Sequence, residues 1–306
     1  MTLATAPLTT DRPVARRRRV GDALPQIVLA PSFAAVIVFV YGFILFSIYL
    51  SATSSRLLPV YDFIGFSNYV RLFQLPNWTL ALKNLAIFGS LYIAICCAVG
   101  LLLAILIDQK IRIEGLLRPI FLYPMAISFI VTGTAWKWML DPGIGIAQTM
   151  HALGWESFSF TWIKDSEMAI YTIVIAAVWQ SSGFIMAMFL AGLRGIDGEM
   201  IKAAQIDGAS AFQTYRRIVI PQLKPVFLSA FVVLAHLAIK SYDLVVAMTN
   251  GGPGRATEMP STFMYSYTFT RSQMGIGASS AVIMLMMISA VIVPYIYSEI
   301  AGEGRP

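Results

Sequence analysis

Two charged side chains, Lys240 and Asp243, interrupt a long apolar run of this 306-residue chain. A charge in hydrocarbon costs at least ~2.5 kcal/mol, so both side chains should face the protein interior or water. On a helix their spacing puts them on one face, where they can pair. His236 lies one turn earlier, and Ser241 and Tyr242 adjoin them. These residues either contact a polar solute or only hold helices together, and the sequence leaves both alternatives open.

A second polar group, Gln180, Ser181 and Ser182, interrupts another apolar run. Amides and hydroxyls can hydrogen-bond a hydroxyl-bearing solute, and an aromatic ring such as Trp179 or Phe184 can cover its apolar face. Small polar residues also join membrane helices without any ligand. These residues therefore either contact a solute or only hold helices together. The candidate solute-binding residues are therefore Gln180, Ser181, Ser182, Phe184, His236, Lys240, Ser241, Tyr242 and Asp243.

No set of residues predicts catalysis. The two histidines, His151 and His236, form no HExxH motif, and no serine or cysteine nucleophile has a base nearby in the sequence. No glycine precedes a lysine, which excludes a phosphate-binding loop of the GxxxxGK[ST] type. Cys96 and Cys97 are adjacent, about 100° apart on a helix, and suit neither a disulfide framework nor a metal site. We expect no enzyme activity, metal or cofactor in this chain.

The composition is that of a membrane protein, with 58% hydrophobic residues, 12% charged residues and a mean hydropathy of +0.72. A helix needs roughly 20 apolar residues to cross the hydrocarbon core. Residues 27–51, 84–107, 168–193 and 274–298 meet this requirement without a charge. Residues 119–136 and 226–248 supply two less regular spans. The fold class predicted is an all-α membrane protein with six transmembrane helices.

Basic residues are distributed unequally between the connections that separate these spans. The side that would hold both termini carries 14 Lys and Arg, and the opposite side carries seven. Because cytoplasmic connections are enriched in basic residues, we expect both termini in the cytoplasm and no role in nucleic-acid binding. The predicted organisation is a basic cytoplasmic tail at 1–24, a permease domain at 25–300 and a short cytoplasmic tail at 301–306.

The connection between spans four and five, residues 194–225, is long but has the pattern of folded structure. Helix formers run from Glu199 to Ile206, and Gly208 suits a left-handed helix C-cap. A second amphipathic helix is expected to begin at Ala209, and Pro221 and Pro225 to end it before span five. Two short helices folded back at the membrane surface would make a knob that fits a partner's groove.

This connection resembles the cytoplasmic EAA loop of the permeases of binding-protein-dependent ABC importers. The family pattern E-A-A-x-x-D-G-A stands here as KAAQIDGA at 202–209, and the later I-x-L-P as IVIP at 218–221. Lys202 replaces the family's glutamate, and Glu199 is the nearest candidate substitute. The resemblance implies a type I ABC importer permease fold with coupling helices. It assigns ATPase coupling to Glu199, Lys202, Ala203, Ala204, Asp207, Gly208, Ala209 and Pro221.

Other stretches resemble sugar permeases. Residues 65–69 read GFSNY, as before span two of those proteins, and the TNGGP at 249–253 is similar to a turn of the maltose-type first permease. Two stretches, residues 179–194 and the one from 239–243 through 261–265, are most similar to a glucose/mannose branch. In maltose-type permeases span five contributes to the sugar site, which implies that Ser241 is a polar contact there.

The resemblance implies a permease subunit of a sugar importer in the bacterial inner membrane, working by alternating access. Its expected partners are a second six-span permease, an ATPase dimer that binds ATP and Mg²⁺, and a periplasmic or lipid-anchored sugar-binding protein. The alternative is an ion-coupled secondary transporter that acts without an ATPase. Such transporters usually show internal repeats and midplane carboxylates. Asp243, near the end of a span, is the one acidic residue within the expected spans.

Overall fold

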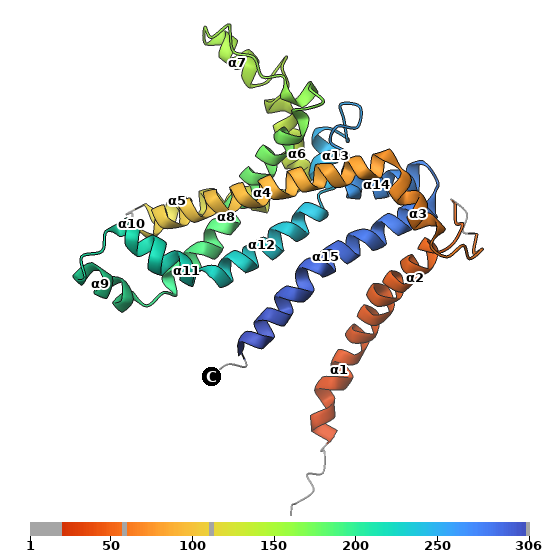
Figure 1. Ribbon diagram of the computed structural model, residues 1–306, viewed down its shortest axis with the longest axis horizontal. Helices are drawn as coiled ribbons and strands as arrows, with labels where there is room; N and C mark the ends of the chain where they lie inside the picture. Colours follow the sequence, from red (N-terminus) through yellow and green to blue (C-terminus); the bar gives the residue numbers. More distant parts are fainter. Residues whose placement is uncertain (1–19, 57–59, 110–112, 304–306) are drawn as a thin grey trace, which may run out of the picture. The chain divides into compact units, whose positions relative to one another are not determined.

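The computed structural model describes residues 20–56, 60–109 and 113–303, and these are helical apart from loops and one isolated β-bridge between Thr53 and Phe63 (Figure 1). Four helices are long and apolar enough to cross a membrane: Val28–Ser51, α4 (Pro76–Asp108), α8 (Ala169–Arg194) and Met274–Tyr297 within α15 (Met274–Glu303). Two bent helix pairs bring the number to six if each is one span. The all-α membrane fold predicted from composition is therefore confirmed.

The chain divides into two compact units, Met1–Phe46 and Ser47–Pro306. The described part of the first unit is helical, with α1 (Val20–Val36), a π-helical turn (Ile37–Tyr41) and the start of α2 (Gly42–Ser51). Residues 1–19 and 304–306, which belong to the two predicted tails, lie outside the described residues. Helix extends into the remainder of both predicted tails, since α1 begins at Val20 and α15 ends at Glu303.

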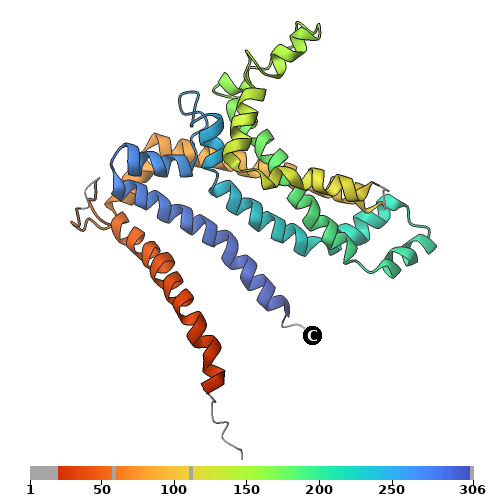
Figure 2. The ribbon, with the colours of Figure 1, turned by 180° about the vertical axis from the view of Figure 1, so that it is seen from behind.

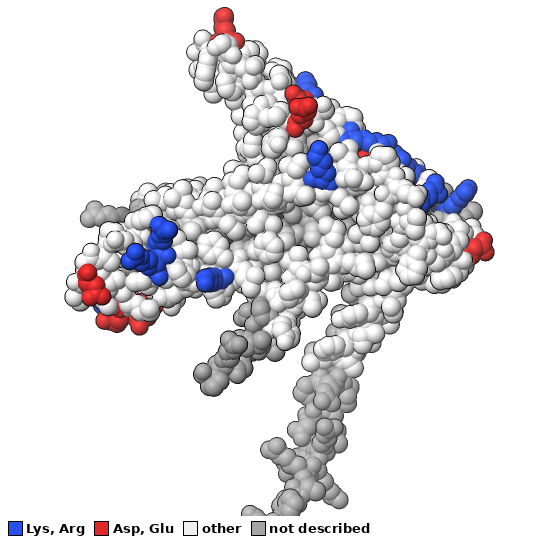
Figure 3. Space-filling view, viewed as in Figure 1, with Lys and Arg blue, Asp and Glu red and all other residues white. Residues whose placement is uncertain are grey.

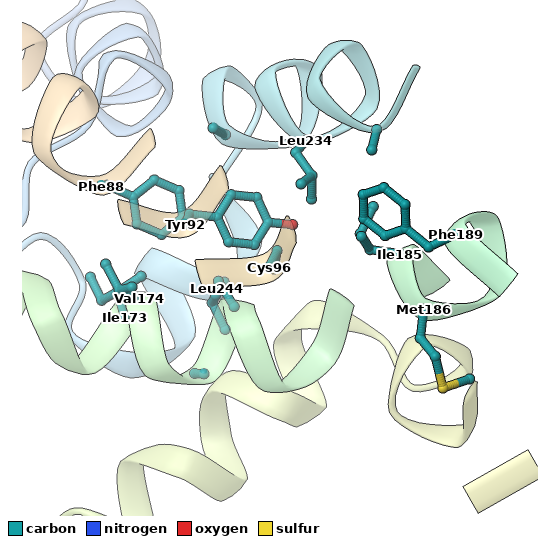
Figure 4. Packing of buried hydrophobic residues seen from close by; sticks show 14 of the residues in the cluster. Phe88, Tyr92, Cys96, Ile173, Val174, Ile185, Met186, Phe189, Leu234 and Leu244 are labelled. Atoms are coloured by element: carbon teal, nitrogen blue, oxygen red, sulfur yellow. The ribbon is translucent and has the colours of Figure 1, made fainter. Parts of the chain in front are cut away.

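The core of the second unit lies where α4 crosses α8, with α12 (Lys224–Ile239) packed against both (Figures 1 and 2). Apolar side chains from the three helices converge there, as Figure 4 shows for Phe88 and Tyr92 of α4, Phe189 of α8 and Leu234 of α12. Cys96 is a buried free thiol in this cluster.

Glycine allows two helices to approach α8 closely. A Cβ on Gly183 would lie 1.7 Å from the carbonyl oxygen of Phe121 in α5 (Glu114–Ala126). A Cβ on Gly100 of α4 would lie 2.7 Å from a methyl group of Ile185. These separations are shorter than any real carbon contact, so the backbones of α4 and α5 could not keep their places against a larger residue.

The third predicted span is not one continuous helix. α5 ends at Ala126 and α6 (Phe129–Met139) begins after a bend of 98°. Ser128 caps α6, its Oγ accepting a hydrogen bond from the Val131 N–H at 3.3 Å. The prediction of an unbroken helix over 119–136 is wrong, because Pro124 near the end of α5 and this N-cap together direct the chain out of the helix.

The fifth predicted span is also broken. α12 ends at Ile239, residues 240–242 are non-helical, and α13 (Asp243–Met248) continues the chain. With 16 residues, α12 is shorter than the roughly 20 that a full crossing requires. At its other end α12 meets the helical stretch Ala211–Gln222 at a bend of 62°. The prediction of one helix over 226–248 is therefore wrong.

The end of the second unit opposite the 194–225 connection is built from shorter helices. α3 (Ser67–Gln74), α14 (Pro260–Tyr265) and a π-helical turn (Ser266–Thr270) pack against the start of α15. Buried Asn84 fixes the loop between α13 and α14, donating to the carbonyls of Ala256 and Glu258 at 2.9 Å each. Between α6 and α8 the chain forms α7 (Ile146–Ala152) and a 3-10 turn (Trp162–Lys164).

Replacing Gly183 with alanine should destabilise this core, because the new methyl group would meet the Phe121 backbone. We expect a loss of about 1–3 kcal/mol, typical of overpacking, and a lower melting temperature of the purified chain in detergent. Gly115→Ala is the matched control. It makes the same change inside α5, but nothing lies within 4 Å of its Cβ position. Equal melting temperatures for the two variants would contradict the close approach.

Candidate functional site

A cavity of about 130 Å³ lies at the break between α12 and α13. It is lined by residues from five elements: Phe88 and Tyr92 of α4, Phe129 of α6, Ala177 of α8, Leu237 of α12, and Lys240, Ser241, Tyr242, Asp243 and Leu244 at the break and in α13. Aromatic rings form one part of the wall, and charged and hydroxyl groups form another. Such a lining can hold a small polar molecule that also has an apolar face.

Lys240 and Asp243 both line this cavity and are exposed. The prediction that they share a helix face and pair is wrong, since the helix ends at Ile239 and Asp243 starts another. Among the described residues, neither side chain forms an ion pair within 4.0 Å. The two exposed charges are therefore not neutralised by each other.

Ser241 stands at the middle of the break. Its carbonyl accepts a hydrogen bond from Ser261 Oγ of α14 at 3.1 Å, which satisfies a backbone group outside any helix. Its own Oγ is buried and has no hydrogen-bond partner among the described residues. Tyr242, next in the chain, packs its ring on Tyr265 with centroids 5.1 Å apart. Ser241 thus lines the cavity, while its hydroxyl oxygen is buried beside it.

Other candidate residues lie elsewhere. Gln180 is buried, and its Nε2 donates to the Ile127 carbonyl at 2.7 Å, where α5 gives way to α6. Ser181 accepts a hydrogen bond of 2.6 Å from Tyr92, which itself lines the cavity. Ser182 lies on a separate, largely apolar groove beside Trp179, and Phe184 packs against the core.

The histidine candidate, His236, is half-buried in α12, and its Nδ1 has no partner among the described residues. It does not line the cavity. Three aromatic residues that do line it, Phe88, Tyr92 and Phe129, were not among the predicted site residues. Aromatic residues are common in apolar spans, so no spacing or composition signal distinguished these three rings.

The connection between α8 and α12 folds as two helical segments, as its sequence indicated. Asp197 caps α9 (Gly198–Ile206), its carboxylate accepting from the Glu199 N–H at 2.9 Å. Gly208 has a φ of +78°, the left-handed conformation expected of it. Ser210 and Gln213 form a capping box at the start of α10 (Ala211–Thr214).

The second segment continues from α10 through a π-helical turn (Tyr215–Val219) into α11 (Ile220–Gln222). Pro221 lies inside this helical stretch rather than ending it, and Pro225 lies in the first turn of α12. The expected stop therefore falls between the two prolines, at Leu223. Pro225 is tolerated because the N–H groups in the first turn of a helix have no partner within that helix.

The surface of this connection combines charge with exposed apolar groups (Figure 3). Met200, Ile206 and Phe212 are exposed, Ile206 to 86%. Lys202, at the family's glutamate position, forms an ion pair of 2.8 Å with Glu199 on the same helix face. Of the other coupling candidates, Ala204 is buried, Ala209 is half-buried, and Ala203 and Asp207 are exposed.

An ion network anchors the start of the connection. Arg194, the last residue of α8, contacts Glu114 of α5 at 2.7 Å and Asp108 of α4 at 3.6 Å. Glu114 also pairs with Arg118 at 2.9 Å. The ends of three core helices are therefore joined directly where the two-helix connection begins.

Comparison with known proteins agrees with this architecture. A family model described as "Binding-protein-dependent transport system inner membrane component" matches residues 97–301. This range includes the whole two-helix connection and both broken spans. The chain belongs to this family. It is a permease subunit of a binding-protein-dependent ABC importer, a membrane component whose ATPase is a separate protein.

Individual relatives cover most of this permease. A probable ABC transporter permease protein of Pyrococcus horikoshii is 41% identical over 292 residues, which are 94% of this chain and 100% of the relative. The xylose/arabinose import permease protein of Haloferax volcanii is 32% identical over 248 residues, 80% of this chain and 78% of the relative.

Among solved structures, a chain of a bacterial ABC transporter involved in the import of the acidic polysaccharide alginate has a TM-score of 0.76. It is 19% identical, and the alignment covers 90% of this chain and 96% of that chain. At this identity the likeness concerns the fold alone. The ABC importer permease fold predicted from the sequence is confirmed.

Replacing Gln180 with leucine should destabilise this permease, because the carbonyl of Ile127 would lose its side-chain donor in an apolar environment. An unsatisfied buried polar group costs about 1–3 kcal/mol. The melting temperature in detergent measures the effect. Ser182→Ala, two residues further along α8, is the control, since the Ser182 hydroxyl makes no hydrogen bond to any described residue. An effect of Gln180→Leu no larger than that of Ser182→Ala would contradict this role.

Proposed function

We propose that this subunit moves a mono- or small oligosaccharide across the membrane by alternating access, and that the solute passes through the cavity at the α12–α13 break. The observation that carries the proposal is the lining of this cavity. Rings of Phe88, Tyr92 and Tyr242 suit the apolar face of a sugar. Ser241, Lys240 and Asp243 suit its hydroxyls, which both donate and accept hydrogen bonds.

The names of relatives support a sugar as the solute. They include a xylose/arabinose import permease, a trehalose/maltose permease of Thermococcus litoralis and a diacetylchitobiose uptake permease of Streptomyces coelicolor. Within the sugars we favour glucose or mannose, because the two ends of one stretch that resembles that branch, residues 239–243 and 261–265, meet at the Ser261–Ser241 hydrogen bond beside the cavity. Uptake of labelled glucose and mannose, compared with xylose and maltose, tests this choice.

The proposed assembly contains a second permease, an ATPase dimer that binds ATP and Mg²⁺, and a periplasmic or lipid-anchored sugar-binding protein. A second permease is required because this cavity has a polar lining on one side only and makes half of a pathway. The knob formed by α9 and α10–α11 is the proposed contact with the ATPase. Its exposed Met200, Ile206 and Phe212 can enter an apolar groove there.

The proposed orientation puts this knob and both termini in the cytoplasm of a cell bounded by an inner membrane. The charge bias supports this placement, since the side of the knob carries 14 of the basic residues that lie outside the spans and the other side carries seven. Lys202 stands at the family's glutamate position, and its ion pair with Glu199 partly neutralises it. Glu199 thus remains near the place where the family has its acidic group.

Replacing Gly208 with valine should impair coupling while leaving insertion intact. A β-branched residue is strained at a φ of +78°, by about 1 kcal/mol or more, and the turn between α9 and α10 would shift. We expect sugar-stimulated ATPase activity of the reconstituted complex to fall. Gly198→Val, in the first turn of α9 with no contact at its Cβ position, is the control. Normal stimulation in Gly208→Val would contradict the coupling role, and uptake without any ATPase would contradict the importer proposal.

Replacing Lys240 with glutamine or Asp243 with asparagine should weaken uptake without affecting assembly, because neither charge forms an ion pair with any residue that the structure describes. Loss of one hydrogen bond to a sugar is worth roughly 1–3 kcal/mol, or about 5- to 150-fold in apparent affinity. Uptake in proteoliposomes and the yield of assembled complex are measured together.

Lys137→Gln and Asp62→Asn are controls for this experiment, since both residues are exposed and lie outside the cavity. Wild-type uptake by both single variants would remove Lys240 and Asp243 from the solute site. Recovery of uptake in the double variant would instead indicate a structural pair.

A further inference from the structure

A second hollow, of about 800 Å³, lies at the end of the molecule opposite the knob. Its lining comes from residues 54–56, 60 and 64 after α2, from α3, and from residues 271–273, 275 and 276 at and just before the start of α15. Three arginines line it, Arg56, Arg71 and Arg271, although they are far apart in the sequence. Figure 3 shows basic side chains gathered at this end of the second unit.

These three guanidinium groups have no carboxylate partner. Among the described residues none of them lies within 4.0 Å of an Asp or Glu oxygen. Arg271 lies 4.6 Å from the centre of the Tyr267 ring and donates to its hydroxyl at 3.1 Å. Glu258 pairs with Arg255 at 3.9 Å and also interacts electrostatically with Arg271 from beyond 4.0 Å. Three like charges around one hollow repel each other, and a bound anion would remove this repulsion.

Neutral groups in the hollow extend the site beyond a single anion. The hydroxyls of Ser54 and Ser272 line it, and both can donate to an anionic oxygen. Gln273 also lines it, and its Oε1 is buried without a partner among the described residues.

The level of the hollow relative to the membrane is indicated by α3, which carries Arg71. Phe66, Val70 and Phe73 follow the i, i+4, i+7 spacing of one helix face and are exposed by 81%, 59% and 55%. Asn68 and Leu72 lie on the opposite face and are buried against the protein. A short helix that exposes an apolar face at the end of membrane spans lies in the interface, at the level of the lipid headgroups.

We propose that this hollow binds the headgroup of an anionic phospholipid in the leaflet opposite the knob. The arginines hold the phosphate, and Ser54 and Ser272, which also line the hollow, can donate hydrogen bonds to its oxygens. The apolar face of α3 lies among the acyl chains. Arginine clusters are depleted on the side of the membrane opposite the cytoplasm, so a cluster there requires a ligand of its own.

An acidic loop of a partner protein is the competing ligand. The exposed apolar face of α3 favours a lipid, because that face would be left in water if the hollow stood clear of the membrane. The two ligands also predict different effects. A lipid site responds to membrane composition in the isolated chain, whereas a protein site acts only when that partner is present.

The test uses the full-length chain, purified in detergent and stripped of lipid. Its melting temperature is measured with short-chain phosphatidylglycerol, short-chain phosphatidylcholine and inorganic phosphate, and retained lipid is counted by native mass spectrometry. The Arg56→Gln/Arg71→Gln double variant removes two charges that have no partner in the fold. Lys137→Gln is the control for loss of a basic charge on the same side, and the single Arg71→Gln variant serves if the double variant folds poorly.

We expect phosphatidylglycerol to raise the melting temperature of the wild type and of Lys137→Gln, with phosphatidylcholine and phosphate having much smaller effects. The double variant should bind phosphatidylglycerol roughly tenfold or more weakly. An unchanged response of the double variant would overturn the proposal, as would phosphate matching phosphatidylglycerol in the wild type. Unchanged lipid binding together with lost stimulation by the binding protein would assign the hollow to a protein partner.

Discussion

The structure depends on one constraint, that a backbone group inside a membrane must find its hydrogen-bond partner within the protein. Two of the predicted spans are broken, and at each break a carbonyl is left outside the helical pattern. A side chain from another helix satisfies each one. Gln180 of α8 donates to the carbonyl of Ile127, and Ser261 of α14 donates to that of Ser241. The positions of α8 and α14 are therefore tied to the two breaks.

The breaks also lie beside the polar lining of the cavity in an otherwise apolar protein. Past its break each span continues as a short helix, and these two helices, α6 and α13, pack together through Gly133, which lies close to Ala247 and to the carbonyl of Leu244. The cavity lies beside this junction, with Phe129 from the first residue of α6 and Asp243 from that of α13. In a continuous helix at either place, the backbone N–H and C=O groups would be hydrogen-bonded within that helix. The break after α12 places Ser241 outside any helix, with its Oγ unpaired among the described residues.

The sequence predicted features that depend on local signals, and missed those that depend on distant contacts. Uninterrupted apolar runs predicted α4, α8 and α15, and the left-handed turn at Gly208 followed from the residues around it. The breaks were missed because proline is common in membrane helices, so Pro124 gave no clear stop, and because Lys240 and Asp243 at helical spacing suggested a pair. The donors that make the breaks tolerable lie 53 and 20 residues away from the carbonyls that they satisfy. Hydrophobic periodicity in the sequence does not indicate hydrogen-bond donors this far away.

The same contacts connect the knob with the cavity. Arg194 at the end of α8 is held to Asp108 and Glu114, so α4, α5 and α8 are joined where the knob begins. From Arg194 the unbroken helix α8 runs back about 21 Å to Gln180, at 1.5 Å per residue, and Gln180 holds the first break. Ser181, the next residue, bonds Tyr92 in the wall of the cavity. A rotation of α8 driven from the knob would displace both side chains at once. Such a rotation would alter the bend at Ile127 and the position of the Tyr92 ring through contacts within the protein alone.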